Sequence, residues 1–238
     1  MRHRVMAIAL VAVATAVVLP AQQARPGLGA AQTMLNRTAD AILGLKSARF
    51  SVKRLGAPAF LDEKNGVTFT VADCAYAAPD RVSCAVKVSL KNGTIVQVTR
   101  VWVPEGTFQS NPLTRQFGRL TAGSNFNGVL LFTRTGIPEV LRIAVQKAQV
   151  VGKEKLENRD VLHLTGDVSG EKLNPLIGGT LKADLLHSVD LWVEERTAHP
   201  VQLRVNEPEG NAWLIELSRI DEPVDIPTPR LSPPAAKP

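Results

Sequence analysis

The sequence predicts a single α+β domain, mainly a meander of eight or nine antiparallel strands with three helices and an extended tail. The chain has 238 residues, of which 45% are hydrophobic and 21% charged, as in globular domains with one sizeable core. Short runs of alternating apolar and polar residues recur along most of the chain, and clusters of Gly, Pro, Asn and Asp separate them. Such alternation favours strands that bury one face.

Residues 1–30 are predicted to be a secretory signal with a short spacer. Two arginines within the first four residues precede an uncharged, mainly apolar stretch, Val5 to Leu19, and small residues follow it. The stretch is shorter than the roughly 20 residues that a membrane-spanning helix needs, so we expect an exported, extracytoplasmic protein. Cleavage after Ala21 and cleavage after Ala31 both fit. The alternative is an uncleaved signal segment that holds the protein at the membrane.

The folded domain is predicted to begin with a helix over 31–47, where apolar residues such as Leu35 and Ile42 recur at helical spacing. The pattern then changes to the alternation of a strand, with Phe50 and Val52 in the same phase. A strand is therefore expected directly after the helix.

A hairpin is predicted over 66–90, with its turn near Pro79. The two cysteines of the sequence, Cys74 and Cys84, lie opposite each other if the turn centres on that proline. In an oxidising compartment such a pair closes as a structural disulfide. A redox or metal role would need a closer pair or further ligands nearby, and the sequence has neither.

The next turn, at 91–94, contains Asn-Gly, the strongest short hairpin signal, and leads into a strand over 95–103. Residues 107–136 are predicted to be irregular around one apolar island, 129–132. A helix should follow from Ile137, because Pro is favoured in the first helical turn. The remaining predicted elements are strands at 148–156 and 160–168, a short helix at 170–178, and strands at 188–195, 200–206 and 211–220.

Residues 31–222 are expected to form this domain, and 223–238 to form a Pro-rich disordered tail. Six prolines fall within the last sixteen residues. A segment of this composition buries too little apolar surface to fold alone, so we expect it to be extended.

The formal net charge is +6, and removal of Arg2 and Arg4 with the signal would lower it to +4. The densest basic segment, 147–159, also contains Glu154 and Glu157. A nucleic-acid interface would be basic throughout and mixed with aromatic residues. We therefore expect no nucleic-acid partner, while weak attraction to anionic lipid head groups stays open.

No metal, cofactor or nucleophile motif is present: the sequence lacks HExxH, a P-loop and GxSxG. We therefore expect no metal, no cofactor and no enzymatic activity. A Ser/His/Asp site is assembled only by the fold, so a hydrolase that uses His163, Asp167 and Ser169 is an open alternative. Asp and Ser are also ordinary turn residues, which is the plainer explanation for them.

Three stretches of the second half resemble one known family. They are RDVLHLTGDVS at 159–169, VDLWVEE at 189–195, and the segment from Pro200 through Glu207 to Val224. The first half agrees in order, with a helix that runs into a strand. The pattern covers most of residues 31–226, and the chain resembles the LppX/LprG (LppX_LprAFG) family of envelope lipoproteins.

The resemblance implies a fold similar to that of the periplasmic lipoprotein carriers. That fold is a strongly curved antiparallel β half-barrel whose helices cover the concave face around an apolar cavity. It also implies binding and transfer of an acylated lipid or glycolipid, with transient contact to the membrane or to envelope transport proteins, and no catalytic residue. The family's signal ends in an acylated cysteine, whereas Val17 to Ala21 contains none, so no thioether anchor is expected at that site.

Several sheet positions in the predicted inward phase, together with the apolar island and the helix after it, could line such a cavity. Each could equally be ordinary core, and a one-residue slip would exchange inside for outside. The candidates are Phe50, Val52, Phe69, Val71, Val86, Val88, Val96, Val98, Leu130, Leu131, Phe132, Ile137, Val140 and Leu141. A second hypothesis keeps the fold but makes the protein an envelope sensor or scaffold that binds a lipoprotein or another protein.

Overall fold

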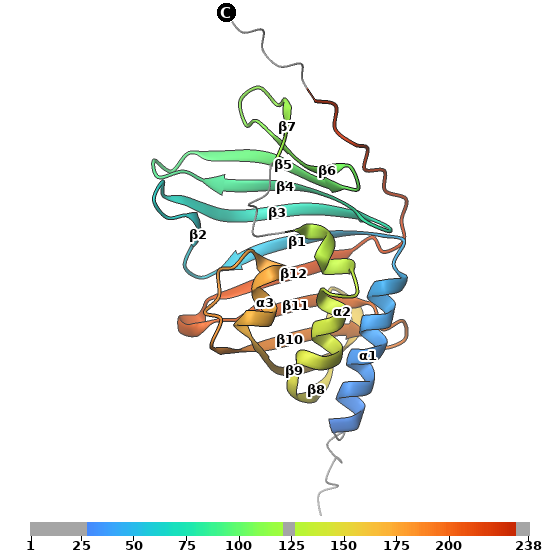
Figure 1. The fold of residues 1–238 in the computed structure, drawn as a ribbon. Helices are drawn as coiled ribbons and strands as arrows, with labels where there is room; N and C mark the ends of the chain where they lie inside the picture. The colour runs from blue at the N-terminus through green and yellow to red at the C-terminus, as the bar shows by residue number, and fades with distance from the viewer. Residues whose placement is uncertain (1–27, 121–126, 232–238) are drawn as a thin grey trace, which may run out of the picture.

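The computed structural model describes residues 28–120 and 127–231, and its dominant feature is one large antiparallel sheet (Figure 1). Its strands are β1 (Ser47–Leu55), β2 (Ala59–Asp62), β3 (Val67–Ala77), β4 (Arg81–Ser89), β5 (Ile95–Val103), β6 (Gly106–Ser110), β7 (Phe117–Arg119), β8 (Gln146–Leu156), β9 (Arg159–Ser169), β10 (Leu186–Glu194), β11 (Pro200–Asn206) and β12 (Ala212–Ser218).

The strands follow the order β7-β6-β5-β4-β3-β1-β12-β11-β10-β9-β8, and β2 pairs with β3 beside this path. Neighbours in the sheet are mostly neighbours in the sequence, as a meander requires. There are two exceptions: β1 pairs with β3 and skips the short strand β2, and β1 pairs with β12, so that Phe50 lies opposite Leu217 and Val52 opposite Ile215. This long-range pairing joins the two halves of the meander into one open sheet.

The helical segments are few and short, apart from the first. They are α1 (Leu28–Gly44), the 3-10 turn η1 (Gly128–Phe132), α2 (Ile137–Glu139) with the π-helical turn η2 (Val140–Ala144) directly after it, α3 (Gly170–Ile177) and the 3-10 turn η3 (Pro208–Gly210). Figure 1 shows α1, α2 and α3 over one face of the β8–β12 half of the sheet. Among the described helical segments, η1 contacts the start of β4 at Val82 and the end of β5 at Trp102, and no helix is seen over the rest of these two strands (Figure 1).

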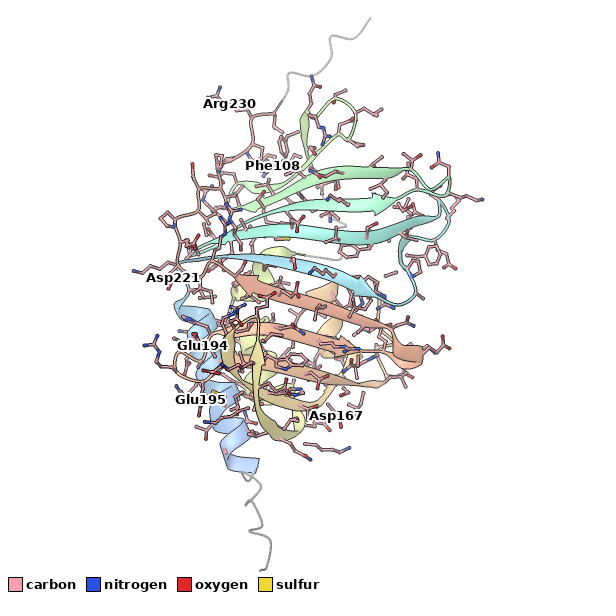
Figure 2. The ribbon with its side chains drawn as sticks, turned by 180° about the vertical axis from the view of Figure 1, so that it is seen from behind. Phe108, Asp167, Glu194, Glu195, Asp221 and Arg230 are labelled. Carbon is pink, nitrogen blue, oxygen red and sulfur yellow. A yellow bond between two sulfur atoms is a disulfide. The ribbon has the colours of Figure 1, made fainter. Side chains whose placement is uncertain are left out.

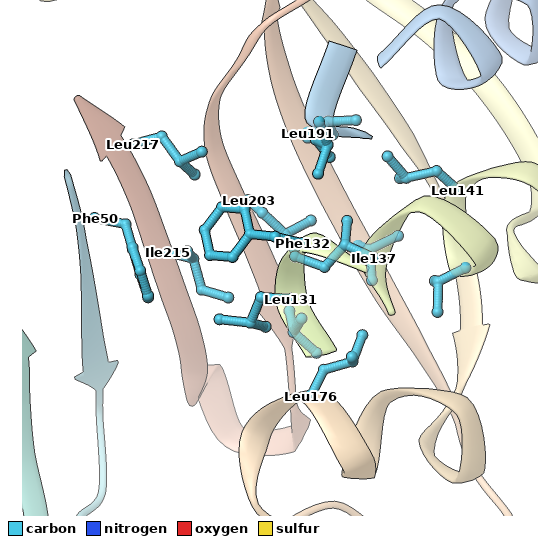
Figure 3. Packing of buried hydrophobic residues seen from close by; sticks show 14 of the residues in the cluster. Phe50, Leu131, Phe132, Ile137, Leu141, Leu176, Leu191, Leu203, Ile215 and Leu217 are labelled. Atoms are coloured by element: carbon cyan, nitrogen blue, oxygen red, sulfur yellow. The ribbon is translucent and has the colours of Figure 1, made fainter. Parts of the chain in front are cut away.

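The main core lies between the helices and the β8–β12 half. Figure 3 shows the ring of Phe132 near Phe50, Ile215 and Leu203, which all face the helical layer. Phe132 stacks on Tyr76, with ring centroids 4.1 Å apart, and meets Phe50 edge-on at 5.3 Å. The apolar island that the sequence places between two irregular stretches is therefore a central part of the core.

The predicted disulfide is confirmed. Cys74 and Cys84 lie directly opposite each other in the β3–β4 hairpin and are bonded. The turn falls at 78–80, as predicted, because β3 ends at Ala77 and β4 begins at Arg81. Both cysteines of the sequence are thus used within the sheet.

Loss of this disulfide is expected to lower the free energy of unfolding by about 3 kcal/mol, since the bond closes a loop of ten residues in the unfolded chain. The change is C74A/C84A, and the measurement is urea denaturation. Reduction of the unaltered protein is the control, and it should produce a similar shift. A decrease below about 0.5 kcal/mol in both cases would show that the bond does not stabilise the sheet.

Other sequence predictions need correction. Residues 107–136 are not irregular throughout, because they contain β6, β7 and η1; residues 121–126 lie outside the described part. β2 was also missed. These strands have only three to five residues, too few for alternation to be recognised. The helix predicted from Ile137 is α-helical for three residues only and continues as a π-turn.

The first part of the tail is extended but not disordered, which corrects the prediction for 223–231. Ile226 is only 4% exposed and packs in a second small core with Val101, Val103 and Phe108. The Nη1 of Arg81 donates a hydrogen bond of 3.0 Å to the carbonyl oxygen of Ile226. Seen from behind, the chain passes from Asp221 toward Arg230 along the edge near Phe108 (Figure 2). Residues 232–238 lie outside the described part.

The predicted signal lies almost wholly in residues 1–27, outside the described part, and residues 28–30 belong to α1. In the two described stretches, no helix is both long enough and apolar enough to cross a membrane.

Candidate functional site

An apolar pocket of about 280 Å³ lies between β1, β3, β4 and β5, the start of β12 and the end of α3. It occupies the part of the helix-bearing face where the helical layer ends. The residues that line it are Val52, Leu61, Val67, Phe69, Ala72, Cys74, Cys84, Val86, Val88, Val98, Arg100, Trp102, Gln109, Leu176, Ile177, Gly178 and Trp213.

The register of the strands explains why these residues gather. Val52 lies opposite Ala72, Ala72 opposite Val86, and Val86 opposite Val98, which forms one row across four strands. Paired residues project from the same face of a sheet, and alternate residues along each strand share that face. The row is therefore a continuous apolar floor.

Five of the predicted cavity residues line this pocket: Val52, Phe69, Val86, Val88 and Val98. Contact of these side chains with a ligand stays a prediction. Val96 lies opposite Val88, at the end of the same face, but outside the lining.

The other predicted residues lie in the core or beside it. Val140 lines a separate hollow between α2 and α3, besides its place in the core. Leu130 is partly buried and packs against the core. The remaining buried members are Phe50, Leu131, Phe132, Ile137 and Leu141.

Val71 does not line the pocket, contrary to the prediction. The register of β3 against β4 shifts between Phe69 and Val71, where the chain contains a bulge. An extra residue in one strand reverses the phase beyond it. Val71 therefore lies opposite Lys53 and Lys87, away from the pocket, whereas Phe69 lines it.

Several pocket residues were missed by sequence reasoning. Leu61 belongs to the short strand β2, and Leu176 and Ile177 reach the pocket only because α3 folds back over the sheet. Trp213 could have been found, since it is in phase with Ile215 and Leu217 in a predicted strand. Arg100 could not be predicted from the alternation of apolar residues, because its side chain is charged.

A larger hollow, of about 700 Å³, lies on the opposite face of the sheet, between β1, β3 and β4, the β8–β9 turn and the tail. Its lining contains charged side chains such as Arg49, Asp73, Glu216 and Arg159. Desolvation of such groups by hydrocarbon is costly, so this hollow is unsuited to an acyl chain.

The residues of the hydrolase alternative are not brought together. His163 and Ser169 are six positions apart in β9, which separates them by roughly 20 Å along the strand. His163 lies instead between two carboxylates, Glu154 (2.8 Å from Nδ1) and Asp190 (3.1 Å from Nε2). Hydrogen bonds from Trp192 and from His163 lower the pKa of Glu154. Within the described residues, no group of three or more His, Cys, Asp or Glu could hold a metal ion.

The fold and the pocket define a class of proteins built on one open, mostly antiparallel sheet with few helices. The chain belongs to the LppX_LprAFG lipoprotein family, whose sequence profile matches residues 30–226. This confirms the family that the sequence stretches indicated.

Two solved structures share the fold. LprF from Mycobacterium bovis has a TM-score of 0.68 at 16% identity, covering 86% of this chain and 99% of that one. LppX from Mycobacterium tuberculosis has a TM-score of 0.60 at 19% identity, covering 84% and 100%. No curated protein matches the chain.

Proposed function

We propose that this protein binds a lipid or glycolipid in the bacterial cell envelope, without catalysis, and transfers it. The observation that supports the proposal most is the apolar pocket beside α3, together with membership in a lipoprotein family. In this proposal the helix-bearing face is the concave side of a half-barrel, and the protein acts outside the cytoplasm. It acts without a cofactor.

The size and chemistry of the pocket suit one hydrocarbon chain. Its volume of about 280 Å³ is close to the lower end, roughly 300 Å³, of pockets that hold small molecules. Each buried methylene contributes about 0.8 kcal/mol, so a chain of about ten carbons provides roughly 8 kcal/mol before entropic losses. This is sufficient to hold a lipid without a covalent bond.

Native mass spectrometry of the full chain, purified from a lipid-producing bacterial host, tests the proposal. We expect mass adducts that organic extraction removes and that fragment as acylated molecules. A protein without adducts that also fails to take up added lipid would refute the carrier function. If the lipid-free protein instead formed a stable complex with an envelope protein, the scaffold hypothesis would replace the carrier hypothesis.

The open end of the pocket has features of a membrane contact. Leu61 lines the pocket and is 51% exposed, and its neighbour Phe60 is 53% exposed. Phe60 lies in one row with Ile95, which is also exposed, through the paired residues of β3 and β4. This row projects from the opposite face of the sheet, at the strand ends beside Leu61. Lys64 and Lys91 line the surface hollow beside Phe60, together with Glu63. Apolar side chains flanked by lysines favour the surface of an anionic bilayer.

The double variant F60S/I95S is expected to reduce binding to phosphatidylglycerol-containing vesicles about tenfold or more, because two apolar side chains no longer enter the bilayer. Vesicle co-sedimentation measures the effect. The matched control is L113S, which removes an exposed leucine from the β6–β7 connection. Equal losses in both variants, or none in either, would contradict a membrane contact at this end of the pocket.

A further inference from the structure

Among the described residues that line the apolar pocket, one is charged, Arg100 on β5, and one has an amide side chain, Gln109 on β6. The two residues are paired in the sheet and project from the same face. Gln109 Oε1 accepts hydrogen bonds from Nε of Arg100 at 3.1 Å and from Nη2 at 2.6 Å. The guanidinium also lies 5.9 Å from the ring centroid of Trp102, another lining residue. Arg100 is therefore held in a defined orientation on the wall of the pocket.

This arrangement is the one that binding pockets use for amphipathic ligands. Such pockets are largely apolar, and a small number of placed polar groups fix the orientation of the ligand. Burial lowers the pKa of Arg100, because the charged form loses solvation where the side chain lies. An arginine nevertheless stays protonated at any physiological pH, so the pocket contains a permanent positive charge beside its apolar floor.

The indole of Trp213 forms a second wall of the pocket. Trp213 on β12 lines the pocket and is only 2% exposed. Its ring packs against Phe69, with centroids 5.1 Å apart, but its Nε1–H has no hydrogen-bond acceptor among the described residues. This wall is therefore apolar, and the polar groups of the pocket on the described residues are those of Arg100 and Gln109.

We propose that Arg100, oriented by Gln109, binds the anionic oxygen group of a lipid, a carboxylate or a phosphate, whose acyl chain lies on the floor formed by Val52, Ala72, Val86 and Val98. The planar guanidinium fork matches both groups geometrically. This inference rests on the proposed lipid-binding function and adds the chemical class of the ligand and the residue that selects it.

The experiment compares three probes on the delipidated full chain by titration under native mass spectrometry. They are palmitate, 1-palmitoyl-lysophosphatidic acid and methyl palmitate, which has the same chain without an anionic group. We expect at least one of the two anionic probes to bind about tenfold more tightly than methyl palmitate. Preference for palmitate alone would identify a carboxylate site, and preference for the lysophosphatidic acid alone a phosphate site.

The variant R100M should abolish this preference, so that the two anionic probes bind no more tightly than methyl palmitate. R49M is the matched control, because Arg49 lies in the same sheet but lines the hollow on the opposite face. The second variant, Q109L, keeps the charge of Arg100 but removes the acceptor that orients its guanidinium. We expect Q109L to lose part of the preference for the anionic probes. Urea denaturation of each variant establishes that it is folded.

Equal binding of the anionic and neutral probes by the unaltered protein, or a preference that persists in both R100M and Q109L, would refute the role of Arg100 and leave acyl-chain binding intact. Failure of all three probes to bind would instead refute the proposed function itself.

Discussion

Replacement of Ala72 with tryptophan is expected to weaken lipid binding about 100-fold while the protein stays folded. Ala72 lies on the floor of the pocket between Val52 and Val86 and is 5% exposed. An indole at this position would fill much of the 280 Å³ and exclude several methylenes of the ligand. Exclusion of about four methylenes removes roughly 3 kcal/mol of binding free energy, which corresponds to that factor.

The matched control is A85W. Ala85 lies in the neighbouring strand, next to Val86, and lines the hollow on the opposite face. The A85W variant makes the same chemical change without entering the pocket. Its affinity for palmitate, measured by calorimetry, should therefore stay within about twofold of that of the unaltered protein. Overpacking typically lowers the free energy of unfolding by about 1–3 kcal/mol, which urea denaturation will register separately. Unchanged binding in A72W would place the acyl chain elsewhere.

The largest effect on stability is expected from F132A, which should lower the free energy of unfolding by about 3–5 kcal/mol. Phe132 is buried, stacks on Tyr76 and meets Phe50, so truncation removes contacts to β1 and β3 at once. The ring lies where the helical layer meets the sheet (Figure 3). Loss of the ring leaves a cavity between η1 and the strands on which it packs, near the junction of β1 and β12.

Urea denaturation measures this effect, and F60A is the control. Phe60 is half exposed, so the same truncation there should change the free energy of unfolding by less than about 0.5 kcal/mol. A loss below about 1 kcal/mol in F132A would show that η1 is only loosely attached to the sheet.

The parts of the fold that depend on local patterns could be predicted from the sequence. Alternation and turn residues located the β3–β4 hairpin, and the position of Pro79 between Cys74 and Cys84 led to the correct disulfide. The pairing of β1 with β12 could not be obtained in this way, because it connects residues 157 to 169 positions apart. Neither β6 nor β7 is long enough to show a period.

The candidate site was predicted in part, for physical reasons that differ from residue to residue. Val52, Val86 and Val98 were placed on the pocket side because their strands keep a regular phase. Val71 was misplaced because a bulge reverses the phase of β3, and no residue in the sequence marks that bulge. Phe132 and Leu131 are core rather than lining, a distinction that depends on which surfaces the helices cover and that apolar character alone does not reveal.

The tail illustrates the limit of composition as a guide. Over the described residues 223–231, the chain has neither a helix nor a strand, as its prolines indicate. The composition does not show that Ile226 meets an apolar patch of β5 and β6, because that patch is formed by residues more than a hundred positions earlier. Val224 and Ile226 pack against that patch, and Arg81 also donates a hydrogen bond to the carbonyl oxygen of Ile226.

Photo-crosslinking tests most directly whether the pocket beside α3 receives the acyl chain. Palmitate with a diazirine near the end of its chain would be bound to the full protein, irradiated, and the modified peptides identified by mass spectrometry. Our account predicts labels on pocket-side residues of β3, β4 and β5, such as Phe69, Val86 and Val98, and their loss in A72W. Labels confined to the hollow around Arg49 and Arg159 on the opposite face, or scattered over the surface without saturation, would contradict it.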